Sequence, residues 1–389
     1  MKIVVTGARG LLGWHSAARL HAANCAARYR GMEPPWELEL VDHVRFADPA
    51  ALAEAVRGAD GVLHFAGVNR GNEAEVAAGN PAIARALVAA CRAAGVQPHI
   101  VYANSTHSST NSPYGISKRA AGEILGTVGG GYTDIVLPHI FGECARPYYN
   151  NVTATLIDQL WRGETPGINP EGRVQLLHAG AAANLAIQAV QNGMNGPIMP
   201  KGRDMGIAEL HERLSAFHAG YTADIFPDLT DPFDLALFNS YRTGGYPRFS
   251  PKAMRPHRDA RGMLIETVRA QSGSQSFIST TLPGQRRGEH FHTDLVERFL
   301  VVRGRATIRI RRVLTDEVHS FAVDGEQPVA IDMPPLHTHH IHNDSDGHND
   351  SDGEVVTFFW SHRLFDPANP DTYADPVFVD PVFNKAPQR

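Results

Sequence analysis

The chain has 389 residues, a formal net charge of −5 and 43% hydrophobic residues, which predicts two or three ordinary globular domains at roughly 150 residues each. It contains no basic stripe for a nucleic acid and no apolar run near the roughly 20 residues that span a membrane. Three widely spaced cysteines, Cys25, Cys91 and Cys144, and a start without the apolar core of a signal peptide predict a cytoplasmic protein.

The first 145 residues alternate short apolar runs with alanine-rich stretches. The predicted strands are 2–5, 61–65, 99–103 and 134–137, and the predicted helices include 49–56 and 81–94. Strands that alternate with helices in this way are typical of a parallel sheet with crossover helices. We therefore expect an α/β domain of the Rossmann type, with a doubly wound parallel sheet, at the N-terminus.

A glycine-rich segment, TGARGLLG at 6–13, directly follows the first predicted strand. Gly7 permits a tight turn, Gly10 lets the backbone approach a pyrophosphate, and Gly13 allows the next helix to pack closely on the strand. The free N–H groups and the dipole at the start of that helix favour phosphate. The segment therefore predicts a dinucleotide site, in which Arg9 and Leu11 contact the cofactor together with the three glycines.

The end of the second predicted strand, at 38–41, bears on the choice of cofactor. Asp42 in this position favours the ribose hydroxyls of NAD, whereas Arg45 suits the 2′-phosphate of NADP. Ala66, after the third strand, is a further expected cofactor contact. These residues alone leave NAD and NADP open.

A tyrosine and a lysine four residues apart, Tyr114 and Lys118, share one face of a predicted helix. We expect both to face the cofactor, and the lysine charge to lower the tyrosine pKa so that the phenol exchanges a proton near neutral pH. Ser105, at the end of the fourth predicted strand, is placed to orient the substrate oxygen. Together with the segment 64–67 (HFAG) and Asn80, this set resembles the extended short-chain dehydrogenase/reductase family.

Residues 146–218 carry more helix, whereas 219–250 contain several Pro, Gly and aromatic residues and little periodicity. We expect this second stretch to be a linker that wraps against both domains. The reductase domain is therefore predicted over 1–250, with its dinucleotide part at about 1–145, and a second domain over 251–389.

The second domain is predicted to be all-β. The predicted strands are 263–268, 276–282, 298–302, 306–311, 317–323, 329–333 and 354–360. Many short strands at this spacing are typical of an antiparallel barrel or jelly roll. The sequence HNDSDG at 342–347 is repeated at 348–353. It fails the register of an EF-hand calcium loop, so we expect an exposed hairpin loop.

Histidines and a glutamate in this domain have the spacing of metal ligands. His290 and His292 project from one face of a strand, and Glu297 reaches the same point after a short turn. His339 is the expected fourth ligand, from a later strand, with His337 as the alternative of the same parity. Three imidazoles and one carboxylate suit zinc, or another divalent ion. The pattern resembles the metal site of the cupin fold, which implies a cupin jelly-roll barrel.

Both halves together resemble the CapF-type bifunctional enzymes of bacterial capsule and O-antigen sugar biosynthesis, an extended reductase fused to a zinc cupin. The segments that carry the resemblance are 64–70, 113–115 with 117–118, 141–142 with 147 and 149–150, 259–262, 288–292, 297–302, and 365–367 through 370–373. The resemblance implies a UDP-linked N-acetylated 4-keto-6-deoxyhexose as substrate. It implies C3 epimerisation in the cupin, and then reduction of the 4-ketone by NADPH to UDP-N-acetyl-6-deoxy-L-talosamine.

Two segments depart from this pattern on the substrate side. Residues 179–183 read AGAAA where many extended reductases carry a Val-Asp-Asp turn, and 137–141 read LPHIF, with His139 where Asn is usual. A different nucleotide-linked sugar is therefore an alternative substrate. A non-catalytic dinucleotide and sugar sensor is a second alternative, which Ser105, Tyr114 and Lys118 disfavour, because a sensor needs no proton donor. Relatives of both halves commonly dimerise, so a homodimer is expected.

Overall fold

The computed structural model describes residues 1–260, 262–345 and 353–378. By its internal contacts the chain divides into two compact units, Met1–Arg213 and Leu214–Arg389. The predicted domain boundary at residue 250 remains a prediction. None of the helices in the described parts of the chain is long and apolar enough to cross a lipid bilayer.

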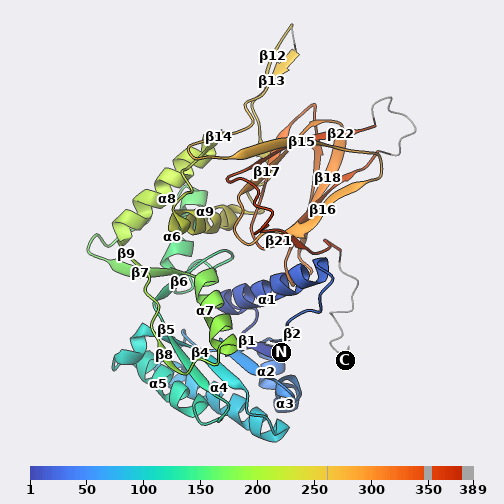
Figure 1. The fold of residues 1–389 in the computed structure, drawn as a ribbon. Coiled ribbons are helices and arrows are strands. Elements are labelled where there is room, and N and C mark those ends of the chain that lie inside the picture. The colour runs from blue at the N-terminus through green and yellow to red at the C-terminus, as the bar shows by residue number, and fades with distance from the viewer. Residues whose placement is uncertain (261, 346–352, 379–389) are drawn as a thin grey trace. The chain divides into compact units, whose positions relative to one another are not determined.

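The first unit is built on a six-stranded parallel sheet in the order β2-β1-β3-β4-β5-β8 (Figure 1). Its strands are β1 (Lys2–Thr6), β2 (Glu37–Val41), β3 (Gly61–His64), β4 (His99–Ser105), β5 (Tyr132–Leu137) and β8 (Gly196–Ile198). Strand β2 lies on one side of β1 and strand β3 on the other, so the order in which strands are added to the sheet reverses between β1 and β3. Ligands of such sheets bind beyond the carboxyl ends of the strands at this point. The predicted Rossmann-type fold is confirmed.

Helices cover both faces of the sheet (Figure 1). Helices α3 (Pro49–Val56), α4 (Glu73–Ala94) and α5 (Pro113–Leu125) bury their apolar residues against one face, and α1 (Leu11–Tyr29) and α7 (Ala179–Gln191) pack on the other. Local sequence sets their ends, as in α4, which begins with a capping box between Asn72 and Glu75 and ends at Gly95 with φ +68°. Two short elements, α2 (His43–Ala47) and η1 (Thr106–Ser109), follow β2 and β4.

A small second sheet in the order β6-β7-β9 completes this unit. It contains β6 (His139–Phe141), β7 (Arg173–His178) and β9 (Arg203–Gly206), while α6 (Val152–Arg162) lies between the first two in sequence and α8 (Ile207–Thr222) follows the third. Because β6 and β7 are parallel, their carboxyl ends lie at the same edge.

A buried network joins that edge to α1. His178 Nε2 lies 2.8 Å from Glu143 Oε2, and His15 Nε2 lies 3.5 Å from the same oxygen and 3.1 Å from the Glu143 carbonyl. Arg19 Nη1 is 3.2 Å from His15 Nδ1. Since a guanidinium only donates, Nδ1 accepts and Nε2 carries the proton. That proton points at Glu143, so the three residues form a hydrogen-bonded network rather than a metal site.

The network holds its groups in fixed charge states. Burial lowers the pKa of His15 to about 3, so this imidazole is neutral at pH 7. Burial alone would raise the pKa of Glu143, but its interactions with His178 and His15 outweigh this effect and hold the pKa at about 2. A buried carboxylate therefore ties α1 to the ends of β6 and β7.

The second unit contains two five-stranded sheets whose pairings are antiparallel (Figure 1). The first has the order β11 (Lys252–Ala253), β20 (Val329–Met333), β17 (Glu297–Arg303), β22 (Val355–Ser361) and β15 (Gln275–Thr281). The second has the order β19 (Val318–Asp324), β18 (Arg305–Arg312), β21 (His337–Asn343), β16 (Arg286–Phe291) and β23 (Tyr373–Ala374). Their facing apolar side chains, such as Phe299, Ile308 and Phe359, form one core. The predicted jelly-roll barrel is confirmed.

Shorter elements precede and flank the barrel. They are β10 (Ile225–Phe226) paired with β14 (Arg269–Ala270), and the hairpin of β12 (His257–Asp259) and β13 (Gly262–Leu264). The strand predicted over 263–268 is therefore confined to its first residues. The predicted hairpin loop of the HNDSDG repeat falls partly on 346–352, outside the described residues.

The prediction of an irregular linker over 219–250 is wrong. Helix α9 (Pro232–Gly245) occupies its centre, with Asp231 as the N-cap and Pro232 in the first turn. Phe238 and Tyr241 of this helix are fully buried. The Pro and aromatic residues that suggested a linker are thus a helix start and a packed face.

Arg298 is the largest fully buried side chain of the chain's described parts. Its Nε lies 2.6 Å from Asp332 Oδ1 and its Nη2 lies 2.8 Å from Asp332 Oδ2, so the pair is bidentate across β17 and β20. The guanidinium also lies 4.8 Å from the centre of the Phe226 ring. Such a pair is tolerated in a core because both charges are fully matched.

The Glu143 network yields a pH-dependent stability prediction. The folded pKa of Glu143 is depressed from 4.5 to about 2, so its stabilisation is complete above about pH 4.5 and is lost as the pH falls through 2. We expect Glu143→Gln to lower the free energy of unfolding by on the order of 3 kcal/mol at pH 7 and by less than half of that at pH 3.

Urea unfolding at both pH values measures this difference. Glu54→Gln is the matched control, because Glu54 is an exposed residue of an i,i+3 ion pair with Arg57 and should matter by less than about 0.5 kcal/mol. An equal cost of Glu143→Gln at pH 7 and pH 3 would contradict the assigned charge state.

Candidate functional site

The glycine-rich turn brings three backbone segments into contact. Gly7 has φ +67°, and a Cβ there would lie 2.8 Å from the Ala66 nitrogen. A Cβ on Gly13 would lie 2.2 Å from the Gly7 oxygen. Gly10 is the N-cap of α1 and Leu11 its first residue, and no side chain caps this helix. The N–H groups of the first turn therefore remain available to an anion.

The end of β2 carries charged residues of both signs. Asp42 caps α2 by accepting hydrogen bonds from the Val44 and Arg45 nitrogens, both at 3.1 Å. Arg9 Nη2 lies 3.1 Å from Asp42 Oδ2, and the Arg9 side chain is 79% exposed. Arg45 instead pairs with Glu39 and donates to the Leu40 carbonyl at 2.9 Å. Arg9 is thus the more available of the two cations.

Ser105, Tyr114 and Lys118 gather past the carboxyl end of β4. Ser105 is the last residue of that strand, and its hydroxyl bonds to the Tyr114 hydroxyl. Lys118 lies one turn after Tyr114 on α5, where Nζ donates to the Ala103 carbonyl at 2.5 Å and lies 4.1 Å from the Tyr102 ring centre. The helix start is fixed by Ser112, whose hydroxyl accepts from the Gly115 nitrogen at 3.1 Å.

The charge states in this group differ from the expectation that Lys118 lowers the pKa of Tyr114. Burial raises the pKa of Tyr114, and the hydrogen bond from Ser105 opposes this rise. Burial lowers the pKa of Lys118 to about 7, although the Asp134 carboxylate opposes the shift. Desolvation is the largest cause of both shifts, and the lysine contacts Ala103 and Tyr102.

Asp134 and Tyr102 were missed at the sequence level. Asp134 sits on β5 beside the end of β4, where Asn104 Nδ2 donates to it at 3.0 Å. The sequence gives little sign that either residue belongs to the site. Each lies inside an apolar strand, where the alternation of side chains predicts only which of them are buried. Asn80 was singled out, and it links the loop after β3 to α5 by donating to Val68 O and to Ser117 Oγ, both at 2.9 Å.

In the second unit, four predicted metal ligands converge at one end of the barrel. The ligand nitrogens of His290, His292 and His339 lie within 4.8 Å of one another. Glu297 Oε2 lies 3.4 Å from His292 Nε2 and 3.5 Å from His339 Nε2. His337 lies apart from them, with its ring 5.5 Å from that of Tyr246. His339, rather than His337, therefore shares this cluster.

A β-bulge sets the register of the cluster. The pairing of β16 with β21 shifts between Gly288 and His290, which places His290 directly opposite His339. Within the bulge, Gly288 has φ +109°, and a Cβ there would lie 2.6 Å from the His339 carbonyl. Bulges are common next to active sites because they redirect side chains. Glycine is required at 288 for this close approach.

The ligand atoms fit a divalent metal. His292 Nε2, His339 Nε2 and Glu297 Oε2 are buried and have no hydrogen-bond partner. Their spacings of 3.4 and 3.5 Å are those of a tetrahedron with metal–ligand bonds of about 2.1 Å. Burial lowers the pKa of His290 to about 4 and that of His339 further. At His292 burial also lowers the pKa, but the Glu297 carboxylate outweighs this effect and raises it. Neutral imidazoles are the form that binds a metal, so an ion would displace a proton from His292.

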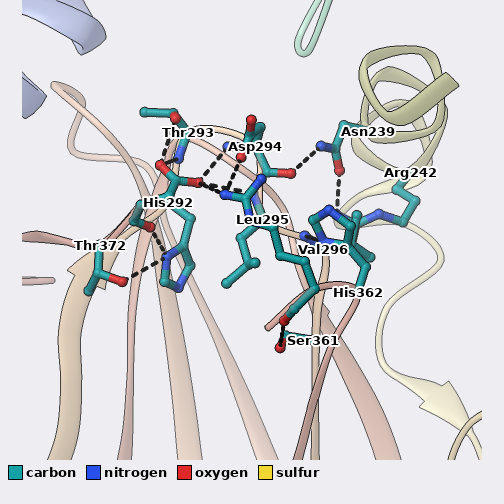
Figure 2. Close-up of polar contacts among 12 residues, drawn as sticks. Asn239, Arg242, His292, Thr293, Asp294, Leu295, Val296, Ser361, His362 and Thr372 are labelled. Atoms are coloured by element: carbon teal, nitrogen blue, oxygen red, sulfur yellow. Dashed lines mark hydrogen bonds and ion pairs between the residues drawn. The ribbon is translucent and has the colours of Figure 1, made fainter. Parts of the chain in front are cut away.

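A second layer of contacts holds the ligand-bearing loop (Figure 2). The Asp371 carboxylate accepts from the backbone nitrogens of Thr293, Asp294 and Leu295 at 2.8, 3.0 and 3.2 Å. The Asp371 carbonyl also contacts His292 Nδ1. Since Nδ1 donates to this carbonyl, Nε2 is left free for a metal. In the sequence the segment 370–373 only carried part of the family resemblance, and in the structure its Asp371 orients His292.

The other side of the loop is held from α9 and from the residues after β22 (Figure 2). Asn239 Nδ2 donates to the Asp294 carbonyl at 2.7 Å, and Arg242 Nη2 donates to Asn239 Oδ1 at 2.7 Å. The Val296 nitrogen donates to His362 Nδ1 at 3.0 Å. The loop between His292 and Glu297 is thereby fixed at both ends.

This cluster predicts which histidine controls metal content. We expect His339→Ala to lower bound zinc at least tenfold, because removing one of four ligands leaves three and opens a cavity in the barrel. Metal analysis by mass spectrometry after desalting measures the effect. His342→Ala is the control, on the same strand but with a side chain that is 27% exposed and lies 2.8 Å from Asp344. Unchanged zinc in His339→Ala would exclude His339 as a ligand.

Both units are similar to known protein families. Residues 3–201, more than half of the chain, match the NAD dependent epimerase/dehydratase family. Residues 257–373 match a polysaccharide biosynthesis C-terminal domain. A Pseudomonas aeruginosa protein, the UDP-2-acetamido-2,6-beta-L-arabino-hexul-4-ose reductase, is 29% identical over 388 residues, which cover 96% of this chain and 98% of that protein.

Solved structures are similar over nearly the whole length. The capsular polysaccharide assembling protein CapF from Staphylococcus aureus is 25% identical, with a TM-score of 0.55, over 97% of this chain and 100% of CapF. CapF with the inhibitor 3-isopropenyl-tropolone has the same fold, at 24% identity and a TM-score of 0.52. The predicted resemblance to CapF-type proteins is confirmed. The chain belongs to the NAD dependent epimerase/dehydratase family, and its reductase-type unit is followed by a polysaccharide biosynthesis C-terminal domain.

Proposed function

We propose that the chain is a bifunctional nucleotide-sugar enzyme. The barrel epimerises C3 of a UDP-N-acetyl-4-keto-6-deoxyhexose, and the Rossmann unit then reduces the 4-ketone to give UDP-N-acetyl-6-deoxy-L-talosamine. The observation that carries the proposal is the presence, in one chain, of a Ser105–Tyr114–Lys118 group and a four-ligand metal cluster. A relative named as a reductase of a UDP-linked hexulose aligns with both units.

In the reductase unit, the nicotinamide supplies a hydride to C4 when it is bound. Tyr114 donates its hydroxyl proton to the C4 oxygen as charge develops there, and Ser105 holds that oxygen by a hydrogen bond. Lys118, with a pKa of about 7, carries a positive charge below neutral pH one helical turn from Tyr114. Gly7, Gly10, Gly13, Leu11 and Ala66 line the expected dinucleotide site.

In the barrel, His290, His292, Glu297 and His339 would hold a zinc ion, and its Lewis acidity would polarise the substrate carbonyl. This polarisation would make the proton on the adjacent carbon, C3, more acidic. With three neutral imidazoles and one carboxylate as ligands, a divalent ion would keep a net positive charge. Epimerisation further needs a base on one face of C3 and an acid on the other.

A different nucleotide-linked sugar is the alternative that a specific observation favours. Ala179 and Gly180 open α7, and neither they nor Ala181 bring a carboxylate to this edge. Glu143 supplies the buried carboxylate next to His178 instead. Moving the carboxylate from the start of α7 to Glu143 would alter which sugar hydroxyls the protein recognises.

Substitution of the proton donor tests the reductase half. We expect Tyr114→Phe to reduce NADPH oxidation by a factor of about 10² to 10⁴, because general acid catalysis contributes that much. Exchange of the C3 proton should persist, since it belongs to the barrel. Absorbance at the nicotinamide band and mass spectrometry measure the two activities. Tyr29→Phe, at a tyrosine that is 85% exposed, is the control, and undiminished oxidation in Tyr114→Phe would contradict the role.

We propose NADP(H) as the cofactor, with NAD as the alternative. The side chain of Arg9 is exposed and pairs with Asp42 next to the end of β2, where an adenosine ribose is expected. The guanidinium offers several N–H donors to a 2′-phosphate. Arg45, the arginine suggested by the sequence, is held by Glu39 and Leu40 and is a weaker candidate.

Removal of Arg9 tests this choice. We expect Arg9→Ala to raise the Kd of NADPH about tenfold or more, because a charged hydrogen bond contributes about 1.5–3 kcal/mol. The Kd of NADH should change less than twofold. Fluorescence titration of both cofactors measures the two constants. An equal rise in the Kd of NADH and of NADPH would mean that Arg9 does not bind the 2′-phosphate.

We also propose that the protein is a homodimer in the cytoplasm. Ile278 on the edge strand β15 is 66% exposed, and Leu264 on the β12–β13 hairpin is 62% exposed. Exposed apolar side chains on an unpaired strand edge favour association with a second chain.

A further inference from the structure

Two arginines and a tyrosine from distant loops of the first unit form a cluster outside the residues discussed so far. Arg70 follows β3, whereas Arg146 and Tyr149 follow β6. The Arg70 guanidinium carbon lies 5.2 Å from the centre of the Tyr149 ring, and that of Arg146 lies 5.0 Å from the same centre. Both distances are within the range of a cation–π contact. One aromatic ring thus gathers two positive charges.

The cluster is held by backbone contacts between the two loops. Arg70 Nη1 donates to the Tyr148 carbonyl at 2.8 Å, and Asn150 Nδ2 donates to the Asn69 carbonyl at 2.8 Å. Tyr148 has φ +58° and Asn150 has φ +50°, on either side of Tyr149. A left-handed tyrosine is uncommon and persists only where its surroundings enforce it. The fold therefore uses strained backbone to present Tyr149 between the arginines.

The two positive charges are not neutralised within the described residues. Neither Arg70 nor Arg146 has a carboxylate within ion-pair distance there, and the Tyr148 carbonyl is the one hydrogen-bond acceptor that Arg70 meets in them. Asp158, an acidic residue of the same region, forms an ion pair with Arg162 at 2.7 Å and accepts a hydrogen bond from the Tyr148 hydroxyl. In a chain with a net charge of −5, a pair of gathered and unmatched guanidiniums points to an anionic ligand.

The position of the cluster fits the substrate rather than the cofactor. Arg70 follows the carboxyl end of β3, and the neighbouring strand β4 ends at Ser105, so both lie past the same edge of the sheet. The diphosphate of the cofactor has its own site at the uncapped start of α1. A second diphosphate-binding site on this edge is expected for a nucleotide-linked substrate.

We propose that Arg70, Arg146 and Tyr149 bind the diphosphate group of the nucleotide-linked sugar in the reductase unit. The free N–H edges of the two guanidiniums receive phosphate oxygens in bidentate pairs. The Tyr149 ring keeps the two arginines together in the absence of the anion. The inference rests on the proposed function for the identity of the substrate, but the anion site itself is testable without any sugar.

A local reporter separates this site from any nucleotide site in the barrel. Tyr149→Trp keeps an aromatic ring in place and reports binding by its fluorescence, measured as the difference from the unsubstituted full-length chain. The probes are UDP and inorganic pyrophosphate, with NADPH already saturating the cofactor site. We expect both probes to change the reporter signal, and Arg70→Ala with Arg146→Ala in the reporter chain to raise both Kd values at least tenfold.

The matched control removes two other exposed arginines, Arg85 and Arg92 of α4, and should change either Kd less than twofold. The Kd of NADPH, measured separately, should also change less than twofold in the chain that lacks Arg70 and Arg146. Equal weakening of NADPH would assign the cluster to the cofactor and overturn the proposal.

Two further outcomes separate the anion site from the proposed function. A signal with pyrophosphate but none with UDP would support the anion site and count against a UDP-linked substrate. A reporter that responds to neither probe, while calorimetry detects UDP binding to the unsubstituted chain, would overturn the inference and leave the proposed function in place.

Discussion

The gathering of three histidines and Glu297 at one point of the barrel is the constraint on which the second unit is organised. His292, Glu297 and His339 turn atoms without hydrogen-bond partners toward one point. Buried polar atoms in this state cost about 1–3 kcal/mol each unless something binds them. A divalent ion would satisfy all of them at once, and the bulge in β16 and the contacts of Asp371 are arranged around these side chains.

Burial also governs the chemistry of the first unit, but there the buried polar groups have partners within the protein. There the polar groups are satisfied by one another, as in the Glu143 network and in the contact of Lys118 with the Ala103 carbonyl. Desolvation lowers the pKa of Lys118 to about 7, so the group can change its charge near neutral pH. The barrel thus gathers three imidazoles and the Glu297 carboxylate at one point, whereas the Rossmann unit holds Ser105 and Tyr114 near a titratable lysine.

The fold was largely predictable, because its signals are local. The glycines at 7, 10 and 13 follow the first strand, and the His290–His292 pair shows the two-residue period of a strand. Long-range partners were not predictable: Asp371 contacts Thr293 across 78 residues, and Arg70 contacts Tyr148 across 78. The pKa direction of Tyr114 was also missed, because desolvation depends on packing that spacing does not reveal. Helix α9 was missed because its aromatic residues resembled those of a linker.

We propose that one chain carries two activities on one nucleotide sugar. One reaction in heavy water tests it, with NADPH and a UDP-N-acetyl-4-keto-6-deoxyhexose, followed by mass spectrometry of the nucleotide sugar. If both activities are present, the recovered sugar contains solvent deuterium at C3 and its 4-ketone has gained two hydrogens. A nucleotide sugar recovered with neither change would contradict the account, and deuterium at C3 without reduction would contradict its reductase half.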